Sequence, residues 1–322
     1  MKKPVYSIIL TAIAALFIAT AATAQQEVKP WEGMKEVNGT KLFCKVVGEG
    51  EPLLIIHGGP TMNHEYFLPH LMPLAHSYKL IFFDQRATGR SEMVDSSEMS
   101  WSAMIEDIDG VRQAFGLDSV NILAHSWGTK LAMIYAMEHP DRVKKLVLSN
   151  PIVMSHEFDS LQTVLMAGKV SAEDKQQFKT LTRSEAFAKG DLSVIKELLM
   201  LNYKSGFYDT ANLKYLEINL PENFMQSSMV TMKGLMSDQQ NYDRNYYPLM
   251  PEMKMPVLII HGMADNIVIQ ADEKMQQSMG NARLVRFNKS GHFPFIEEND
   301  KYMKTIIEFL GTPAAAADNK KK

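Results

Sequence analysis

Short, mostly apolar runs recur along the chain and predict its strands. Each run has the length of a strand, and no alternation of polar residues marks one of its faces as solvent-exposed. Runs of this kind are typical of parallel strands that helices cover on both faces. In chain order they are Leu53–Ile56, Leu80–Phe83, Val120–Leu123, Leu146–Leu148, Val257–Ile260 and Leu284–Phe287.

Helical periodicity fills several of the intervals between these runs. Apolar residues from Trp101 to Phe115 recur at helical spacing, with Ser100 as the expected N-cap and Gly116 as the expected C-cap. Further helices are predicted over Leu131–Met137 and Asn299–Leu310. The alternation of strands and helices predicts the α/β class, with a doubly wound, mostly parallel sheet.

This alternation stops between residues 151 and 250. The stretch has no comparable apolar strand run, is rich in methionine and tyrosine, and has amphipathic helical patterns such as Ser193–Leu201. Because the strand pattern resumes at Val257, we expect a helical cap (151–250) inserted into one core domain (25–150 and 251–313). Ligands bind at the carboxyl edge of open α/β sheets, so the cap is expected over that edge.

The N-terminal residues have the pattern of a secretion signal. Lys2 and Lys3 precede the apolar run Ile8–Ala22, and Ala22-Thr23-Ala24 forms a small-residue cleavage site. We expect residues 1–24 to be a signal peptide, and the mature protein to be periplasmic or secreted without a stable membrane span. An uncleaved membrane anchor is the alternative. The lysine-ended residues 314–322 are expected to form a disordered tail.

Composition and charge exclude few classes of protein. The chain has 322 residues, of which 46% are hydrophobic and 22% are charged, as in ordinary globular proteins. Its 34 basic and 37 acidic residues give a net charge of -3, which offers no reason to expect a nucleic-acid partner. The single cysteine, Cys44, has no partner for an internal disulfide and is expected to be a small hydrophobic residue of a strand.

A candidate nucleophile follows the third apolar run. Ala124-His125-Ser126-Trp127-Gly128 comes directly after Val120–Leu123, where it predicts a sharp turn from a strand into a helix. A serine hydroxyl is a poor nucleophile at neutral pH unless such a turn exposes it and a histidine accepts its proton. Ser126 is therefore the candidate nucleophile, and the chain should supply a base and an acid.

His292 and Asp265 are the candidate base and acid. His292 lies in a loop after the last predicted strand, and Asp265 follows the strand Val257–Ile260. A carboxylate at that place can hold the imidazole in the tautomer that accepts the serine proton. Taken singly, His292 could be a surface residue and Asp265 a turn residue. Their joint order with Ser126 along the chain favours a catalytic triad.

The chain also supplies two candidate backbone donors for an oxyanion hole. One is the N–H of Trp127, at the start of the helix after the nucleophile, and the other is the N–H of Gly59. Gly59 belongs to His57-Gly58-Gly59-Pro60, immediately after the first apolar run. Gly58 would let this backbone approach the substrate closely. A triad with such a hole needs no metal and no cofactor, so none is expected.

The positions of Ser126, Asp265 and His292 resemble those of the α/β-hydrolase superfamily. Three motifs together resemble its proline iminopeptidase branch, which is a group of serine exopeptidases. The motifs are His57-Gly58-Gly59-Pro60, Asp84-Gln85-Arg86 with Gly89-Arg90-Ser91, and Ser126-Trp127-Gly128. The resemblance covers roughly residues 36–150 and 255–310. Ala124, Thr61 and Ala87 stand where the family patterns have glycine, which weakens the expectation of proline specificity.

The resemblance implies an α/β-hydrolase fold and a serine hydrolase, most simply an aminopeptidase that releases N-terminal residues from short peptides. Such an enzyme binds a free amino group, and Glu217 and Glu222 are the nearest carboxylates in the expected cap. A solvated helix face is the alternative for either one. A carboxylesterase or lactonase with the same triad, and a non-catalytic binding protein on this fold, remain open. The oligomeric state is also open.

Overall fold

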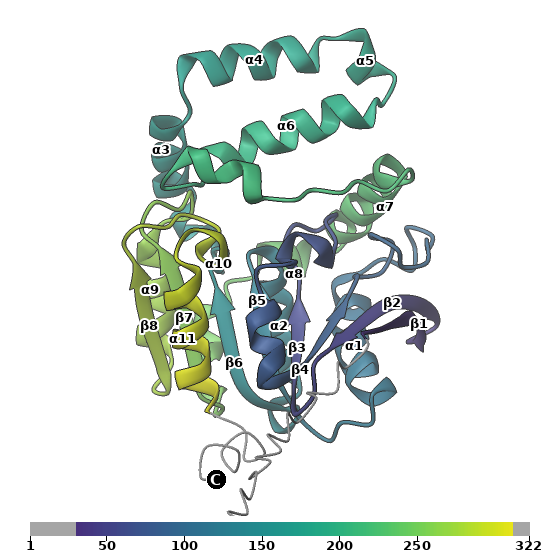
Figure 1. Cartoon of the computed structure of the whole chain (residues 1–322), viewed down its shortest axis with the longest axis vertical. Helices are drawn as coiled ribbons and strands as arrows, with labels where there is room; N and C mark the ends of the chain where they lie inside the picture. Colours follow the sequence, from purple (N-terminus) through teal and green to yellow (C-terminus); the bar gives the residue numbers. More distant parts are fainter. Residues whose placement is uncertain (1–29, 312–322) are drawn as a thin grey trace, which may run out of the picture.

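An eight-stranded sheet lies at the centre of the part of the chain that the structure describes, residues 30–311 (Figure 1). In this computed structural model the strand order is β1-β2-β4-β3-β5-β6-β7-β8. β2 is antiparallel to both of its neighbours, and the other neighbouring strands are parallel. The predicted doubly wound α/β fold is confirmed. The predicted signal peptide (1–24) and tail (314–322) lie outside the described residues.

All the apolar runs that predict strands form strands. The eight strands are β1 (Trp31–Val37), β2 (Thr40–Val47), β3 (Glu51–Ile56), β4 (Tyr78–Phe83), β5 (Val120–His125), β6 (Val143–Ser149), β7 (Val257–Gly262) and β8 (Ala282–Phe287). The runs do not predict β1 and β2, which pair as a hairpin at Asn38-Gly39. Both turn residues have positive φ, 46° and 79°, as the tight turns of such hairpins require.

Two hydrophobic cores, one on each face of the sheet, explain the unbroken apolar runs. Successive residues of a strand point to opposite faces, so Leu54 and Ile56 join one core while Leu53 and Ile55 join the other. Helices α1 (Trp101–Ala114), α2 (Trp127–Glu138) and α9 (Ile269–Ser278) cover the first core, and α10 (Pro294–Glu297) and α11 (Asn299–Leu310) cover the second. Because both faces are buried, neither needs polar residues.

Helix α1 begins and ends where its capping residues predict. Ser100 accepts a hydrogen bond from the Ala103 N–H through its side chain, which satisfies one of the free donors of the first turn. Gly116 follows the helix with φ of 67°, a conformation that costs glycine little. Local capping residues therefore mark both ends of this helix.

The segment between β6 and β7 is helical. It holds α3 (Asp159–Lys169), α4 (Ala172–Thr182), α5 (Glu185–Ala188), α6 (Leu192–Lys204), α7 (Phe224–Ser237) and α8 (Gln239–Asp243). Helices α4, α5 and α6 form a layer beyond the carboxyl ends of the parallel strands (Figure 1). Below this layer, Phe207, Leu216 and Ile218 of the same segment are buried in the core that α10 and α11 cover. The exact boundaries between core and cap stay a prediction.

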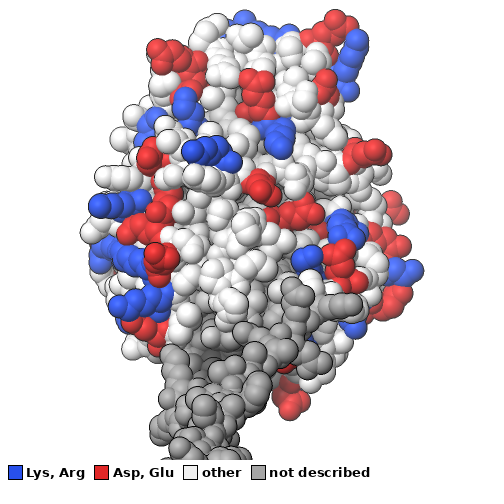
Figure 2. Space-filling model, viewed as in Figure 1, with Lys and Arg blue, Asp and Glu red and all other residues white. Residues whose placement is uncertain are grey.

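The surface carries charges of both signs. On the face of the molecule shown in Figure 2, Lys and Arg side chains are interspersed with Asp and Glu side chains. This mixture agrees with the small net charge of -3. Within residues 30–311, no helix combines the length and the apolar character needed to cross a bilayer.

Candidate active site

Ser126 lies at a strained turn between β5 and α2. Its φ of 53° and ψ of -125° are unusual for a residue with a side chain, and they project the hydroxyl from the carboxyl edge of the sheet. The turn is possible because Gly128 has no side chain: a Cβ there would lie 2.4 Å from the His57 carbonyl oxygen. The fully buried Ala124 is small enough for the other crowded position of the turn.

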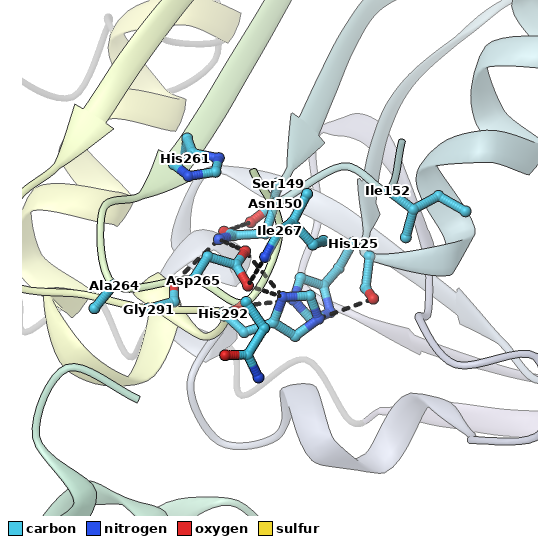
Figure 3. A network of polar contacts seen from close by, with 12 residues as sticks. His125, Ser149, Asn150, Ile152, His261, Ala264, Asp265, Ile267, Gly291 and His292 are labelled. Atoms are coloured by element: carbon cyan, nitrogen blue, oxygen red, sulfur yellow. Dashed lines mark hydrogen bonds and ion pairs between the residues drawn. The ribbon is translucent and has the colours of Figure 1, made fainter. Parts of the chain in front are cut away.

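The structure brings Ser126, His292 and Asp265 together. The Nε2 atom of His292 is 2.9 Å from the Ser126 Oγ, and its Nδ1 is 2.9 Å and 3.0 Å from the two carboxylate oxygens of Asp265. Figure 3 shows Asp265 beside the imidazole of His292. A carboxylate only accepts, so Nδ1 carries the proton and Nε2 is free to accept the serine proton. The chain order of the three residues therefore corresponds to one hydrogen-bonded unit.

Asp265 stays ionised although it is buried. Burial by itself would raise the pKa of this carboxyl, but the charge of His292 and its hydrogen bond outweigh that effect. With help from His261 and Asn150 they lower the pKa of Asp265 to about 2. The carboxylate can therefore orient His292 and stabilise its protonated form over the whole neutral range.

Asn150 is a member of the site that the sequence analysis does not single out. Its Nδ2 donates to the Asp265 Oδ2 at 2.6 Å and to the Gly291 carbonyl oxygen at 3.0 Å, so it ties the acid to the histidine loop (Figure 3). The residue has φ of 50°, a backbone conformation that asparagine tolerates better than most residues. Its position directly after β6, at the carboxyl edge of the sheet, was the available signal.

The glycine loop after β3 lies against the nucleophile. A Cβ on Gly58 would be 2.8 Å from the Ser126 Cβ, which shows how closely the backbone approaches the serine. The Gly58 N–H donates to the Tyr66 hydroxyl at 2.6 Å and is therefore already used. Among the hydrogen bonds of residues 30–311, neither the Gly59 N–H nor the Trp127 N–H is a donor. These two groups are free to bind a developing oxyanion.

The segment from Asp84 to Ser91 supports this loop from behind. The Gln85 side chain donates to the His57 carbonyl oxygen at 2.8 Å, and the Gln85 N–H donates to the His57 Nε2 at 3.0 Å. Arg86 is paired with Asp107, and both side chains are buried. These bonds are made within the protein, so this segment holds the loop beside the site in place.

The cavity beside Ser126 is small and neutral. Its volume is about 10 Å³, room for about one water molecule. The segment between β6 and β7 contributes Tyr203 and Leu216 to its lining; the other lining residues are Gly58, Gly59, Met62, Tyr66, His125, Ser126, His292 and Phe293. None of them is a carboxylate, so a free amino group would find no carboxylate counter-charge in the lining of this cavity.

Glu217 and Glu222, predicted to bind a substrate amine, do not line this cavity. Both are exposed. The chain around Glu217 alternates: Leu216 and Ile218 point into the core, so the side chain between them points outward. The structure thus brings the triad and the glycine loop together and leaves these two carboxylates apart from them.

One group of potential metal ligands occurs among the described residues. Glu106, Glu138 and His139 present ligand atoms within 4.8 Å of one another. Ser126 directly precedes α2 and Glu138 ends it, so the length of this helix, roughly 18 Å, separates the group from the nucleophile. The His139 Nε2 lies 3.3 Å from the Glu106 carboxylate, a hydrogen bond that accounts for the proximity of these two side chains. The group belongs to the surface of α1 and α2, apart from the triad.

The comparisons with known proteins agree with this architecture. Residues 51–299 match the family model described as the alpha/beta hydrolase fold. The match covers most of the chain, and the chain therefore belongs to that family.

Within the family, the chain is similar to proline iminopeptidases. It is 28% identical over 293 residues to that of Lactobacillus delbrueckii subsp. bulgaricus, covering 83% of this chain and 93% of the relative. It is 26% identical over 296 residues to that of Saccharolobus solfataricus, covering 87% and 92%. The resemblance that the motifs indicate is confirmed at this level.

Solved structures of different hydrolases share the fold. The proline iminopeptidase of Mycobacterium smegmatis has a TM-score of 0.64 at 17% identity and covers 87% of this chain and 97% of its own. The esterase of Exiguobacterium antarcticum has a TM-score of 0.61 at 21% identity, with coverage of 87% and 99%. At such identities the likeness concerns the fold alone.

Proposed function

We propose that this protein is a serine hydrolase in which Ser126, His292 and Asp265 act as a catalytic triad. The observation that carries the proposal is the unbroken hydrogen-bonded series from the Ser126 Oγ through the imidazole to the Asp265 carboxylate. The strained serine turn and the two free N–H groups of Gly59 and Trp127 add the remaining parts of an acyl-transfer site.

The geometry suggests the following sequence of steps. The Ser126 Oγ attacks the substrate carbonyl carbon while His292 Nε2 takes the hydroxyl proton, and the Gly59 and Trp127 N–H groups bind the negative carbonyl oxygen. His292 then gives its proton to the leaving amine or alcohol. Water, activated by the same imidazole, hydrolyses the acyl-enzyme and frees Ser126. Asp265 orients the imidazole and stabilises its positive charge throughout.

For the substrate, we propose short peptides from which an N-terminal residue is released. This proposal rests on the proline iminopeptidases that match the chain over more than four fifths of its length. Recognition of a free amine would then require a carboxylate from outside the present lining of the cavity, because that lining has none.

An ester or lactone substrate is the second candidate, and one observation favours it. The segment between β6 and β7 contributes Tyr203 and Leu216 to the cavity, and both side chains are uncharged. An uncharged lining suits a neutral acyl group. Prolyl and alanyl p-nitroanilides, compared with p-nitrophenyl acyl esters that have no free amine, distinguish the two. A higher kcat/KM on the anilides supports the aminopeptidase, and a marked preference for the esters overturns it.

The catalytic assignment is tested with a fluorophosphonate, which labels activated serines. We expect the folded wild-type protein to be labelled and to hydrolyse at least one of these substrates. Ser126→Ala should abolish labelling and lower kcat by at least about 10³-fold. Ser227→Ala is the matched control, since the Oγ of this buried serine on α7 has no hydrogen-bond partner among residues 30–311. Unchanged hydrolysis in Ser126→Ala would refute the proposal.

A further inference from the structure

A single hydroxyl group links the glycine loop to the turn that carries the nucleophile. Tyr66 lies on the short helix η1 (His64–Phe67), and its side chain is 3% exposed. Its oxygen is 2.6 Å from the Gly58 nitrogen and 2.8 Å from the Nδ1 of His125, the residue before Ser126. The contact with His125 joins segments 59 residues apart in the sequence.

The link continues from His125 to the histidine of the triad. The other ring nitrogen of His125, Nε2, is 2.8 Å from the backbone carbonyl oxygen of His292. The N–H of the same residue, His292, donates to the Gly206 carbonyl oxygen at 2.6 Å. The backbone of His292 is therefore anchored on both sides, by the nucleophile turn and by the segment above the sheet.

The direction of each hydrogen bond follows from the chemistry of the groups. A carbonyl oxygen only accepts, so the proton of His125 is on Nε2 and its Nδ1 is an acceptor. The Tyr66 hydroxyl must therefore donate to Nδ1 and accept from the Gly58 N–H. Burial lowers the pKa of His125 to about 3, with a smaller contribution from His292, so the ring stays neutral and this arrangement persists.

Tyr66 lines the cavity, but its hydroxyl is fully engaged. The group has one proton, given to His125, and it receives the Gly58 N–H, while burial raises the pKa of the phenol well above its usual value. It is therefore poorly suited to exchange protons with a substrate. The hydroxyl instead holds the Gly58 peptide with its N–H turned toward Tyr66. The N–H of Gly59 is then the donor that this loop offers to an oxyanion.

We propose that Tyr66 and His125 are positioning residues that hold the oxyanion loop and the backbone of His292 in register with Ser126. The inference rests on the proposed triad and deepens it. Without the hydroxyl, the Gly58 N–H and the His125 Nδ1 would both be buried without a partner, and the loop would relax toward other acceptors. An oxyanion donor displaced by about 1 Å can cost on the order of 10²-fold in rate.

Tyr66→Phe is the direct test, because it removes only the hydroxyl. We expect kcat to fall roughly 10- to 100-fold with KM within about twofold, since the loop acts on the transition state more than on ground-state binding. The rate of fluorophosphonate labelling at Ser126 should fall in parallel. Tyr135→Phe is the matched control: it removes another buried hydroxyl, bonded to Asp109 at 2.8 Å, away from the site.

A second pair of variants keeps the test decisive if Tyr66→Phe is poorly folded. His125→Gln retains one acceptor and one donor, whereas His125→Leu has neither. We expect the Gln variant to keep at least about tenfold more kcat than the Leu variant, although both lose the imidazole. Thermal unfolding of every variant separates loss of fold from loss of rate.

The outcomes separate this inference from the proposed function. If wild-type protein neither turns over a substrate nor reacts with the fluorophosphonate, the proposed function fails. If wild-type protein is active and Tyr66→Phe keeps kcat within twofold, the positioning role is wrong and the triad stands. Equal losses of kcat in Tyr66→Phe and Tyr135→Phe would likewise overturn it, since they would reflect general destabilisation alone.

Discussion

Asp265 illustrates at the scale of one residue how the fold maintains a buried charge. The side chain is almost completely buried, yet His292 and Asn150 supply hydrogen bonds to its carboxylate. The low pKa that results links the site to the stability of the whole protein, because a group that binds protons differently in the folded and unfolded states makes stability depend on pH.

The sign of this dependence follows from the direction of the shift. The pKa of Asp265 falls from 3.8 to about 2 on folding, so its stabilising contribution is complete above pH 4 and is lost as pH falls toward 2. The contribution is on the order of 2 kcal/mol. We expect the free energy of unfolding, measured by urea denaturation, to decrease from pH 5 to pH 2 by a smaller amount in Asp265→Asn than in the wild type. Equal losses in both proteins would contradict this assignment.

At the same scale, the residues with recognisable chemistry were predicted and their partners were not. Ser126, Asp265 and His292 each follow a predicted strand and lie in a recognisable turn motif, so the sequence indicates them. Tyr66 and Asn150 act through contacts with distant segments, which no local pattern encodes.

At the scale of elements, the junction of β5 and α2 depends on close backbone contact. Gly128 packs with its Cα against the end of β3, where an added Cβ would meet two backbone carbonyl oxygens at 2.4 Å and 2.8 Å. Backbone atoms cannot move aside as a flexible side chain can. The helix could then not start at its present distance from the strand, and the turn that carries Ser126 would have to shift.

Two identical substitutions should therefore have opposite effects on stability. Gly128→Ala is expected to lower the free energy of unfolding by about 2 kcal/mol or more and to impair hydrolysis. Gly168→Ala, in α3 where an added Cβ meets nothing within 4 Å, should raise it by up to about 1 kcal/mol. Urea denaturation measures both. A neutral Gly128→Ala variant would refute the role assigned to this close contact.

Some helices and strands are easier to predict from their local sequence than others. Helices α1 and α11 begin and end within a residue of their predicted bounds, because periodicity and capping are local properties. The hairpin of β1 and β2 has no long apolar run. Trp31 and Met34 of β1 are exposed at the edge of the sheet. Its one local signal is the Asn38-Gly39 turn.

At the scale of the whole molecule, the segment between β6 and β7 narrows the site, because its Tyr203 and Leu216 line the cavity beside Ser126. The cavity of about 10 Å³ next to Ser126 has room for about one water molecule, so we expect the segment between β6 and β7 to shift before a substrate of the proposed size enters. Helix α3 is attached to the loop that holds Asp265: Lys169 donates to the carbonyl oxygens of Ala264 and Asp265. These bonds would resist opening.

The attachment predicts a rate limit. With a bulky fluorophosphonate, labelling of Ser126 should reach a plateau rate at high reagent concentration, because opening then precedes reaction. Lys169→Met, which removes the donor, should raise that plateau by about fivefold, as expected for about 1 kcal/mol less resistance to opening. Lys189→Met is the control, since Lys189 directly follows α5 and pairs with Glu185 of that helix. A labelling rate that stays proportional to reagent concentration in both variants would exclude this limit.

The sequence by itself determined the class of the fold, most strands and helices, and the three residues of the proposed triad. It could do so because burial on both faces, helical period and turn chemistry are recorded in neighbouring residues. Only the tertiary structure decided which side chains face Ser126. It directs Glu217 outward, lines the cavity with Tyr203 and Leu216, and joins Tyr66 to His125. Those contacts depend on how distant loops pack against one another, and that packing is a property of the whole chain.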